Sequence, residues 1–358
     1  MKNLVILIFA ILFLFHCNKS PIGEDELTLR GGFETDTLFL PLFTSSTAIK
    51  NIPLGSSQNL VLCKDNNYES RILLRFSFSD TTYQGLDEIK LVLYRNTTFK
   101  SDSIIFSVHL LNHEFTESEA TWYKKSNTEP WENPGGDFEF DSLRMGKAKG
   151  DSLIVWFNYI DLNKIRNAKG LILVPRSTGF LVFTSREGGK APSFKIIKNN
   201  VIHTVPLSSD CHIAKTDSLP NPWEDWLGSG ISYRNFVIFN YDTILNNSRP
   251  IFGELTFSLA GYSCHRDSVE IGVRYLVEPF TGFETKLGPV IALKKFSLKD
   301  TIFKIDVVEY VQRIVENSDS NFGLFIYLSP ENFDIANIKL IKGSHKLKVG
   351  YVRPPEER

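Results

Sequence analysis

The chain has few cysteines and no excess of charge of either sign. Its 358 residues include four cysteines and two methionines, and 40 basic residues nearly balance 41 acidic ones. A nucleic-acid-binding protein needs a concentrated basic surface, which this balance does not indicate. No Cys-x-x-Cys pair or Cys/His spacing typical of a zinc site occurs, and no glycine-rich phosphate loop. We therefore expect no nucleic-acid partner, no metal site and no cofactor.

Motifs of catalysis are also missing. The sequence has no Gly-x-Ser-x-Gly elbow and no His-Glu-x-x-His segment. Glu114, Glu117 and Glu119 cluster, and two carboxylates can cleave a glycosidic bond when burial raises the pKa of one of them. These three lie in a polar loop, where water would solvate them all. We predict that the protein is not an enzyme and rank a polysaccharide-degrading enzyme lowest among the functions considered.

Only one long apolar run occurs, and it lies at the N-terminus. Lys2 precedes an unbroken apolar segment from Leu4 to Phe15. A bilayer-spanning helix needs about 20 apolar residues, whereas a run of this length is typical of an export signal. We therefore expect the remainder of the chain to be exported.

The cysteine that follows this run is a candidate for lipidation. Cys17 stands where bacterial lipoprotein signals place the cysteine that becomes the lipidated first residue, although His16 departs from the usual small residue before it. We predict a signal over residues 1–17, a lipid anchor on Cys17 and a polar tether over 18–26. The protein would then be held on a membrane of the bacterial cell envelope, periplasmic or surface-exposed.

Three further cysteines follow, and export permits disulfides. Cys63, Cys211 and Cys264 cannot all pair with one another, and sequence alone does not fix the pairing. Cys211 with Cys264 is the expected pair because both lie in the second half of the chain.

The aromatic content favours strands. Phenylalanine alone occurs 28 times, in short segments of alternating apolar residues separated by turn signals. Such segments are typical of an antiparallel β-sandwich, here jelly-roll-like. A helical period of 3.6 residues is sustained only within 159–165 and 305–315. The sequence thus predicts an all-β protein with two short helices.

An internal repeat divides the chain. Asp102 to Phe115 reads DSIIFSVHLLNHEF, and Asp267 to Phe280 reads DSVEIGVRYLVEPF. The shared residues are an Asp-Ser turn pair and alternating apolar positions, which a sandwich strand needs to end a loop and face a core. We predict two tandem β-sandwich domains, over 27–198 and 200–353, and a tail over 354–358. The repeat indicates a duplicated scaffold, so function is sought in residues that the copies do not share.

The first copy resembles a known family. Arg75-Phe76, Thr121-Trp122, the segment 183–187 (FTSRE) and Pro192 occur in the order typical of a DNRLRE domain. The resemblance implies a non-catalytic, secreted bacterial β-sandwich module, and some relatives bind carbohydrate, including acidic polysaccharides. It also implies that Trp122 is a structural anchor. The second half looks like a diverged copy without these signatures.

Aromatic residues in loops are the candidates for binding. A sugar ring stacks on an exposed aromatic face, and lysine can meet a carboxylated sugar. Trp156 lies in the apolar strand LIVWF, where core packing would explain it. We predict a polysaccharide partner; the alternative is a structural or adhesive surface protein with sandwiches as spacers or as docking units for an unknown protein. The expected binding residues are Tyr123, Lys124, Lys125 and Trp131 in the first copy, and Trp223 and Trp226 in the second.

Arg186 and Glu187 form a charged pair beside a tight turn. We expect this pair to order the strand that follows it, the last of the first domain.

Overall fold

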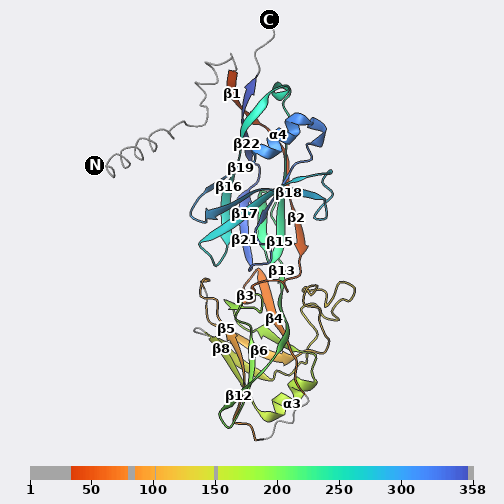
Figure 1. Ribbon diagram of the computed structural model, residues 1–358, viewed down its shortest axis with the longest axis vertical. Helices are drawn as coiled ribbons and strands as arrows, with labels where there is room; N and C mark the ends of the chain where they lie inside the picture. The colour runs from red at the N-terminus through yellow and green to blue at the C-terminus, as the bar shows by residue number, and fades with distance from the viewer. Residues whose placement is uncertain (1–33, 80–84, 101, 149–151, 354–358) are drawn as a thin grey trace, which may run out of the picture.

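The computed structural model describes residues 34–79, 85–100, 102–148 and 152–353. The expected signal, the lipidation site at Cys17, the tether and the tail over 354–358 lie outside these ranges. The described chain is nearly all antiparallel β-structure, arranged as two sandwich units stacked end to end along the long axis (Figure 1). The predicted all-β fold is confirmed. No helix within the described ranges is long and apolar enough to cross a bilayer.

The first unit packs two sheets face to face. Alternate residues of both sheets point inward and are almost wholly buried, among them Leu91, Phe106 and Phe194. One sheet, called here the β4 sheet, comprises β3 (Asn59–Lys64), β4 (Tyr68–Phe76), β6 (Ile104–Leu110), β7 (Arg144–Ala148), β9 (Leu171–Pro175), β10 (Gly179–Thr184) and β13 (Leu207–Thr216). The other, the β5 sheet, comprises β5 (Glu88–Tyr94), β8 (Ser152–Phe157), β11 (Ser193–Lys198) and β12 (Val201–Val205).

The second unit is built in the same way, but its two layers join along one long strand. β16 (Arg249–Ser263) pairs at one end with β21 and at the other with β19 and β22, so the sheet curls around the core. Phe257, Phe303 and Tyr310 lie in this core. The other strands are β14 (Glu224–Ser229), β15 (Ile231–Phe239), β17 (Ser268–Leu276), β18 (Leu287–Ser297), β19 (Ile302–Asp306), β20 (Leu324–Leu328), β21 (Ala336–Ile341) and β22 (Lys346–Arg353), with short 3-10 turns at Thr243–Leu245 and Ser318–Ser320.

The strand order repeats between the units. The order β3-β4-β9-β6-β7 in the first corresponds to β14-β15-β20-β17-β18 in the second. The repeated segments that start at Asp102 and Asp267 thus supply β6 and β17, which occupy equivalent places.

The two expected helices are present. α3 (Tyr159–Asn167) begins with a capping box between Asn158 and Asp161 and precedes β9. α4 (Val308–Glu316) precedes β20 and begins later than expected, because residues 302–306 form β19.

The strand pairing does not follow the predicted domain boundaries. β1 (Glu34–Leu40) and β2 (Leu42–Asn51) pair with β22 and β15 of the second unit. β12 and β13 lie beyond the boundary expected near residue 199, yet they pair with β11 and β4 of the first unit. The N-terminal strands therefore complete the C-terminal unit. An alternating pattern identifies a strand and its buried face but not its partner, which is why the sequence did not reveal this exchange.

Aromatic contacts join the two units. The ring of Phe180 stacks on His265 with centroids 3.5 Å apart, and Phe99 packs against Phe333. Asn59 Nδ2 donates a hydrogen bond to the Phe333 carbonyl oxygen at 2.8 Å.

The expected disulfide between Cys211 and Cys264 is wrong. Both are free, as is Cys63. Cys211 lies on β13 within an apolar cluster of the first unit, whereas Cys264 follows the end of β16 in the second. Burial raises the pKa of Cys264 to about 11, so this thiol stays protonated at neutral pH.

Candidate functional site

The candidate site lies on the solvent side of the β5 sheet. Lys90 on β5 stands directly opposite Trp156 on β8 and Lys195 on β11, so the three residues form a row across one face. Trp156 is 55% exposed. This surface is called here the Trp156 face and comprises Glu88, Lys90, Tyr94, Ile154, Trp156 and Lys195.

The expectation that Trp156 packs in the core is wrong. Successive side chains of a strand point to opposite faces, and the buried residues of β8 are Leu153, Val155 and Phe157. Trp156 lies four residues after the polar Ser152, so the two side chains point to the same, solvent-facing side of the strand. This alternation is the sequence signal that could have placed Trp156 outside.

The indole ring of Trp156 is held by a carboxylate on the neighbouring strand. Its Nε1–H donates a hydrogen bond to Glu88 Oε1 at 2.7 Å. Lys90 Nζ donates to both oxygens of the same carboxylate, at 3.1 and 3.0 Å. The hydrogen bond from Trp156, followed by that from Lys90, lowers the pKa of Glu88. The ring therefore has a fixed edge and an open face.

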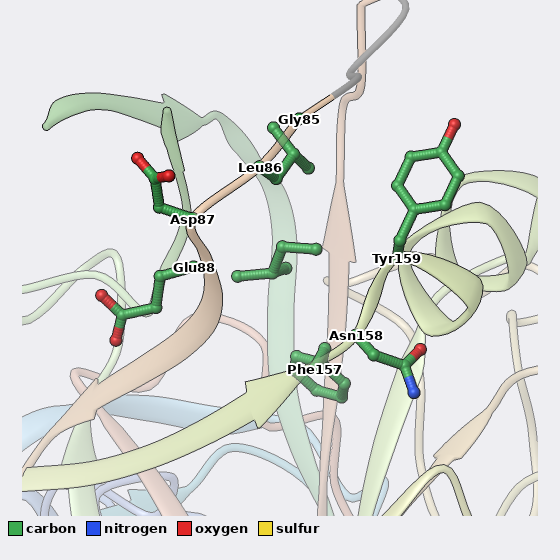
Figure 2. A pocket seen from close by; sticks show the side chains of 8 residues that line it. Gly85, Leu86, Asp87, Glu88, Phe157, Asn158 and Tyr159 are labelled. Carbon is green, nitrogen blue, oxygen red and sulfur yellow. The ribbon is translucent and has the colours of Figure 1, made fainter. Parts of the chain in front are cut away.

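A pocket of about 540 Å³ adjoins the Trp156 face at the start of β5. Its apolar wall is formed by Leu86, Ile89 and Phe157. Asp87 and Glu88 lie at one side, and Tyr159 projects from the first turn of α3 at the other (Figure 2). Glu88 thus belongs both to the pocket and to the support of the tryptophan.

The helix start that carries Tyr159 is firmly anchored. Asp161 is buried and forms an ion pair with Arg144. Arg144 Nε also donates to the Trp156 carbonyl oxygen at 3.0 Å. Arg144 therefore ties the end of β8 to the first turn of α3, so the two aromatic residues of the site have a common support.

The second unit has a smaller pocket at the equivalent place but no tryptophan there. Its volume is about 340 Å³, and its lining includes Phe252, Glu254, Lys294 and Lys304. The outward residues of β19 are Ile302, Lys304 and Asp306. The outward tryptophan is thus a feature of the first copy only.

Two of the expected binding tryptophans cannot stack on a ligand. Trp131 and Trp226 are each only 4% exposed. The Trp131 indole N–H donates to the Thr121 carbonyl oxygen at 2.9 Å, and its ring belongs to a cluster that covers the β4 sheet. Trp226 lies within β14, beside Tyr233, rather than in a loop. Both fill cores, so their assignment to a binding surface is wrong.

The remaining expected residues are dispersed. Tyr123 and Lys124 are exposed, whereas Lys125 pairs with Glu129 at 3.4 Å. Trp223 is 81% exposed at the start of the second unit, where its carbonyl oxygen accepts from the Lys342 N–H.

The anchor role expected for Trp122 agrees with its position. Trp122 is buried in the cluster over the β4 sheet, and the Arg71 guanidinium lies 4.6 Å from its ring centroid.

Three carboxylates approach one another where the loop after β6 meets β13. Ligand atoms of Glu117, Glu187 and Asp210 lie within 4.8 Å of one another, the one such grouping that could hold a metal ion among the described residues. Arg186 pairs with Glu117 at 2.8 Å and with Glu187 at 3.4 Å, and its backbone N–H donates to Asp210. Burial is the largest cause of the rise in the pKa of Asp210 to about 7. Arg186 and Glu187 thus join three segments rather than only ordering the next strand.

The other acids of that loop also have partners. Glu114 forms ion pairs with Arg75 and Lys169, and Glu119 accepts a hydrogen bond from the Asn127 N–H. These contacts give both carboxylates a structural role.

Comparisons with known proteins identify no family. No family model matches the chain, and no curated protein sequence matches it. Among solved structures, the chain is similar to the N-terminal CBM22-1-CBM22-2 tandem domain from Paenibacillus barcinonensis Xyn10C, at 11% identity, over 89% of this chain and 91% of that one. The TM-score is 0.19, too low for the likeness to carry an argument about function.

Proposed function

We propose that the protein is a non-catalytic glycan-binding module whose binding surface is the Trp156 face with its adjoining pocket. The single observation that carries this proposal is the outward indole of Trp156, braced at one edge by Glu88. A rigid, exposed aromatic face loses little entropy when it stacks on the apolar face of a sugar ring.

Polar groups around the ring complete the proposed chemistry. Asp87 and Glu88 supply hydrogen-bond acceptors for sugar hydroxyls, and Lys90 and Lys195 supply donors. Tyr159 adds a second partly exposed aromatic at the pocket. An apolar platform with a few convergent polar groups is typical of a small-molecule site.

We propose a binding role rather than a catalytic one for this site. Asp87 and Glu88 lie on one side of the pocket, so they do not flank a bond as the two acids of a glycosidase do. We propose that the module acts outside the cytoplasm on a lipid anchor at Cys17, on the strength of the N-terminal sequence and the DNRLRE resemblance. A Cys17→Ser variant that still fractionates with membranes would contradict the anchor.

Affinity electrophoresis tests glycan binding. The protein is run through gels that contain neutral or acidic polysaccharides, beside Trp156→Ala and the control Trp223→Ala, which removes an equally large exposed ring elsewhere. Retardation that Trp156→Ala removes and Trp223→Ala leaves intact is expected. Retardation by no polysaccharide, or equal retardation of both variants, contradicts the proposal.

A structural spacer is the second candidate, favoured by the strand exchange between the ends of the chain. β1 and β2 complete the second unit, so in the sequence the first unit is inserted between two parts of the second. The chain therefore crosses between the units twice, once before β3 and once after β13. A spacer predicts no retardation by any polysaccharide together with a single rigid end-to-end arrangement of the two units in solution scattering, and a broad distribution of arrangements would contradict this role.

A further inference from the structure

Arg176 lies on the outer face of the β4 sheet, beside β6. Its side chain is exposed at the end of β9, and its Nε–H donates to Ser107 Oγ at 2.6 Å. Its Nη2 lies 2.9 Å from His109 Nε2. One edge of the guanidinium is therefore fixed by two side chains of β6, and the other faces solvent.

Both anchors are neutral and buried. Ser107 and His109 are each about 1% exposed. His109 Nδ1 lies 2.9 Å from the Glu139 carbonyl oxygen, an acceptor, so Nδ1 carries the proton and Nε2 accepts from Arg176. Burial is the largest cause of the lowered pKa of His109, which keeps the ring uncharged at neutral pH. The serine hydroxyl is covered by Arg176, so it anchors the guanidinium rather than meeting a substrate.

The charge of Arg176 is not neutralised within the described residues. None of their carboxylates forms an ion pair with Arg176, nor with Lys147, which is also exposed. Lys147 on β7 pairs with Ile105 on β6, and the Ile105 carbonyl oxygen accepts from the Arg176 N–H. Arg176, Ile105 and Lys147 thus form a row across the sheet, with the two cations about 10 Å apart at Cα.

Apolar groups flank this row. Ile105 and Met145 are exposed on the same face, because Met145 pairs with Ser107. Phe140, in the loop before β7, is 96% exposed. One fixed guanidinium and an exposed lysine beside apolar surface match a ligand that carries an anionic group on a ring with an apolar face.

We propose that Arg176 and Lys147 form an anion site for the carboxylate or sulfate group of an acidic glycan. A guanidinium held along one edge still offers N–H donors from the other, the geometry that planar oxyanions accept. The site is separate from the Trp156 face, which lies on the other sheet. The glycan character of the ligand rests on the proposed function, whereas anion binding itself rests on Arg176 alone.

Isothermal titration with matched ligands tests the proposal. The probes are oligogalacturonate, its methyl ester, which lacks the charge but keeps the ring, and sodium sulfate. The variants are Arg176→Gln, Arg176→Lys and Lys147→Gln, with Arg249→Gln as a control in the second unit. Arg176→Gln should weaken oligogalacturonate binding roughly tenfold or more, because a charge-assisted hydrogen bond is lost. Arg176→Lys should fall between it and the wild type, and the methyl ester should bind all variants equally.

The outcomes separate the two proposals. Binding of oligogalacturonate or sulfate that weakens in Arg176→Gln but not in Trp156→Ala supports the anion site and contradicts the Trp156 face. A loss in Trp156→Ala with none in Arg176→Gln contradicts the anion site. So does a wild-type protein that binds neither anion, or an Arg249→Gln variant that loses as much as Arg176→Gln.

Discussion

The indole N–H of Trp156 and the carboxylate of Glu88 meet at 2.7 Å across two neighbouring strands. The same carboxylate is bonded by Lys90, so one acid residue fixes both the largest exposed ring and the nearest cation of the Trp156 face. An indole held along one edge presents its open face in a defined orientation, which a stacking site requires. The contact is therefore the starting point for testing whether the face binds a ligand.

Removing the acceptor should weaken binding without unfolding the protein. Glu88→Ala frees the indole to change rotamer, and we expect retention of a bound glycan to fall roughly three- to tenfold, the effect of one lost hydrogen bond. Glu88→Gln keeps an acceptor oxygen for the indole and should stay near the wild type. Equal losses in the two variants would show that charge, rather than ring orientation, is what Glu88 supplies.

The same contact sets a pH dependence. The folded pKa of Glu88 is lowered, so its carboxylate remains charged as the pH falls through the ordinary glutamate range. Protonation weakens the charge-assisted contacts of Glu88 with Trp156 and Lys90, and it occurs only as the pH falls through this lowered folded pKa. Glycan retention should thus be constant from pH 7 to pH 5 in affinity gels, and a decline over that interval would contradict this role of Glu88.

The exchange of strands predicts that a substitution near the N-terminus destabilises the C-terminal unit. Leu40 on β1 is buried in the core of the second unit, so Leu40→Ala should lower the free energy of unfolding by about 2–5 kcal/mol. Phe39→Ala, on the exposed face of the same strand, should change it by about 0.5 kcal/mol or less. Hydrogen exchange locates the effect: faster exchange is expected in β22, and faster exchange in β5 instead would contradict the pairing.

Asp210 predicts a second pH dependence, of opposite sign to the usual one for a carboxylate. Its folded pKa is raised to about 7, chiefly by burial, so the protonated form is favoured in the folded protein. The associated stability is fully present below the unfolded value near 4 and is lost as the pH rises through about 7.

Urea unfolding at pH 5 and pH 8 measures this effect. The wild type should lose on the order of 1–3 kcal/mol more than Asp210→Asn between the two pH values. Asn keeps an acceptor for the Arg186 N–H, so it is a conservative comparison. Parallel behaviour of the two proteins would show that Asp210 does not titrate in this interval.

The free cysteines predict insensitivity to reductant. Cys63, Cys211 and Cys264 are unpaired, so the melting temperature should not change when a thiol reductant is added. Thiol titration in denaturant of protein lipidated at Cys17 should detect all three, whereas little reaction is expected from the folded protein, because Cys63 and Cys211 are buried and the raised pKa of Cys264 keeps its thiol protonated. A melting temperature that falls in reductant would indicate a disulfide.

Local patterns predicted the elements better than their partners. The alternation in the repeated segments that start at Asp102 and Asp267 correctly indicated equivalent strands, because burial of one face imposes a period of two. The exchange of β1 and β2 left no such signal. β1 pairs with β22 and β2 pairs with β15, strands that are distant in the sequence, and a local pattern of apolar residues does not identify such partners.

The candidate binding residues show the same limit. A tryptophan in a loop is exposed only if the loop does not fold back, and the loop that carries Trp131 lies on the β4 sheet and buries it. Conversely, β8 is apolar on both faces, so its composition indicated a core strand. Trp156 and the buried Phe157 are adjacent in the strand and therefore point to opposite faces, and only this alternation indicated that Trp156 is exposed.

The most direct test of the account is a titration of the best-retained oligosaccharide into the wild type, Trp156→Ala, Trp156→Phe and Trp223→Ala, with affinity measured by calorimetry. We predict that Trp156→Ala weakens binding by about 5- to 150-fold, taking the roughly 1–3 kcal/mol measured for nucleobases that stack on aromatic side chains as the scale for one lost stacking contact. Trp156→Phe should retain part of the affinity, and Trp223→Ala should bind like the wild type. Unchanged affinity in a folded Trp156→Ala protein would contradict the assignment of the Trp156 face as the binding surface.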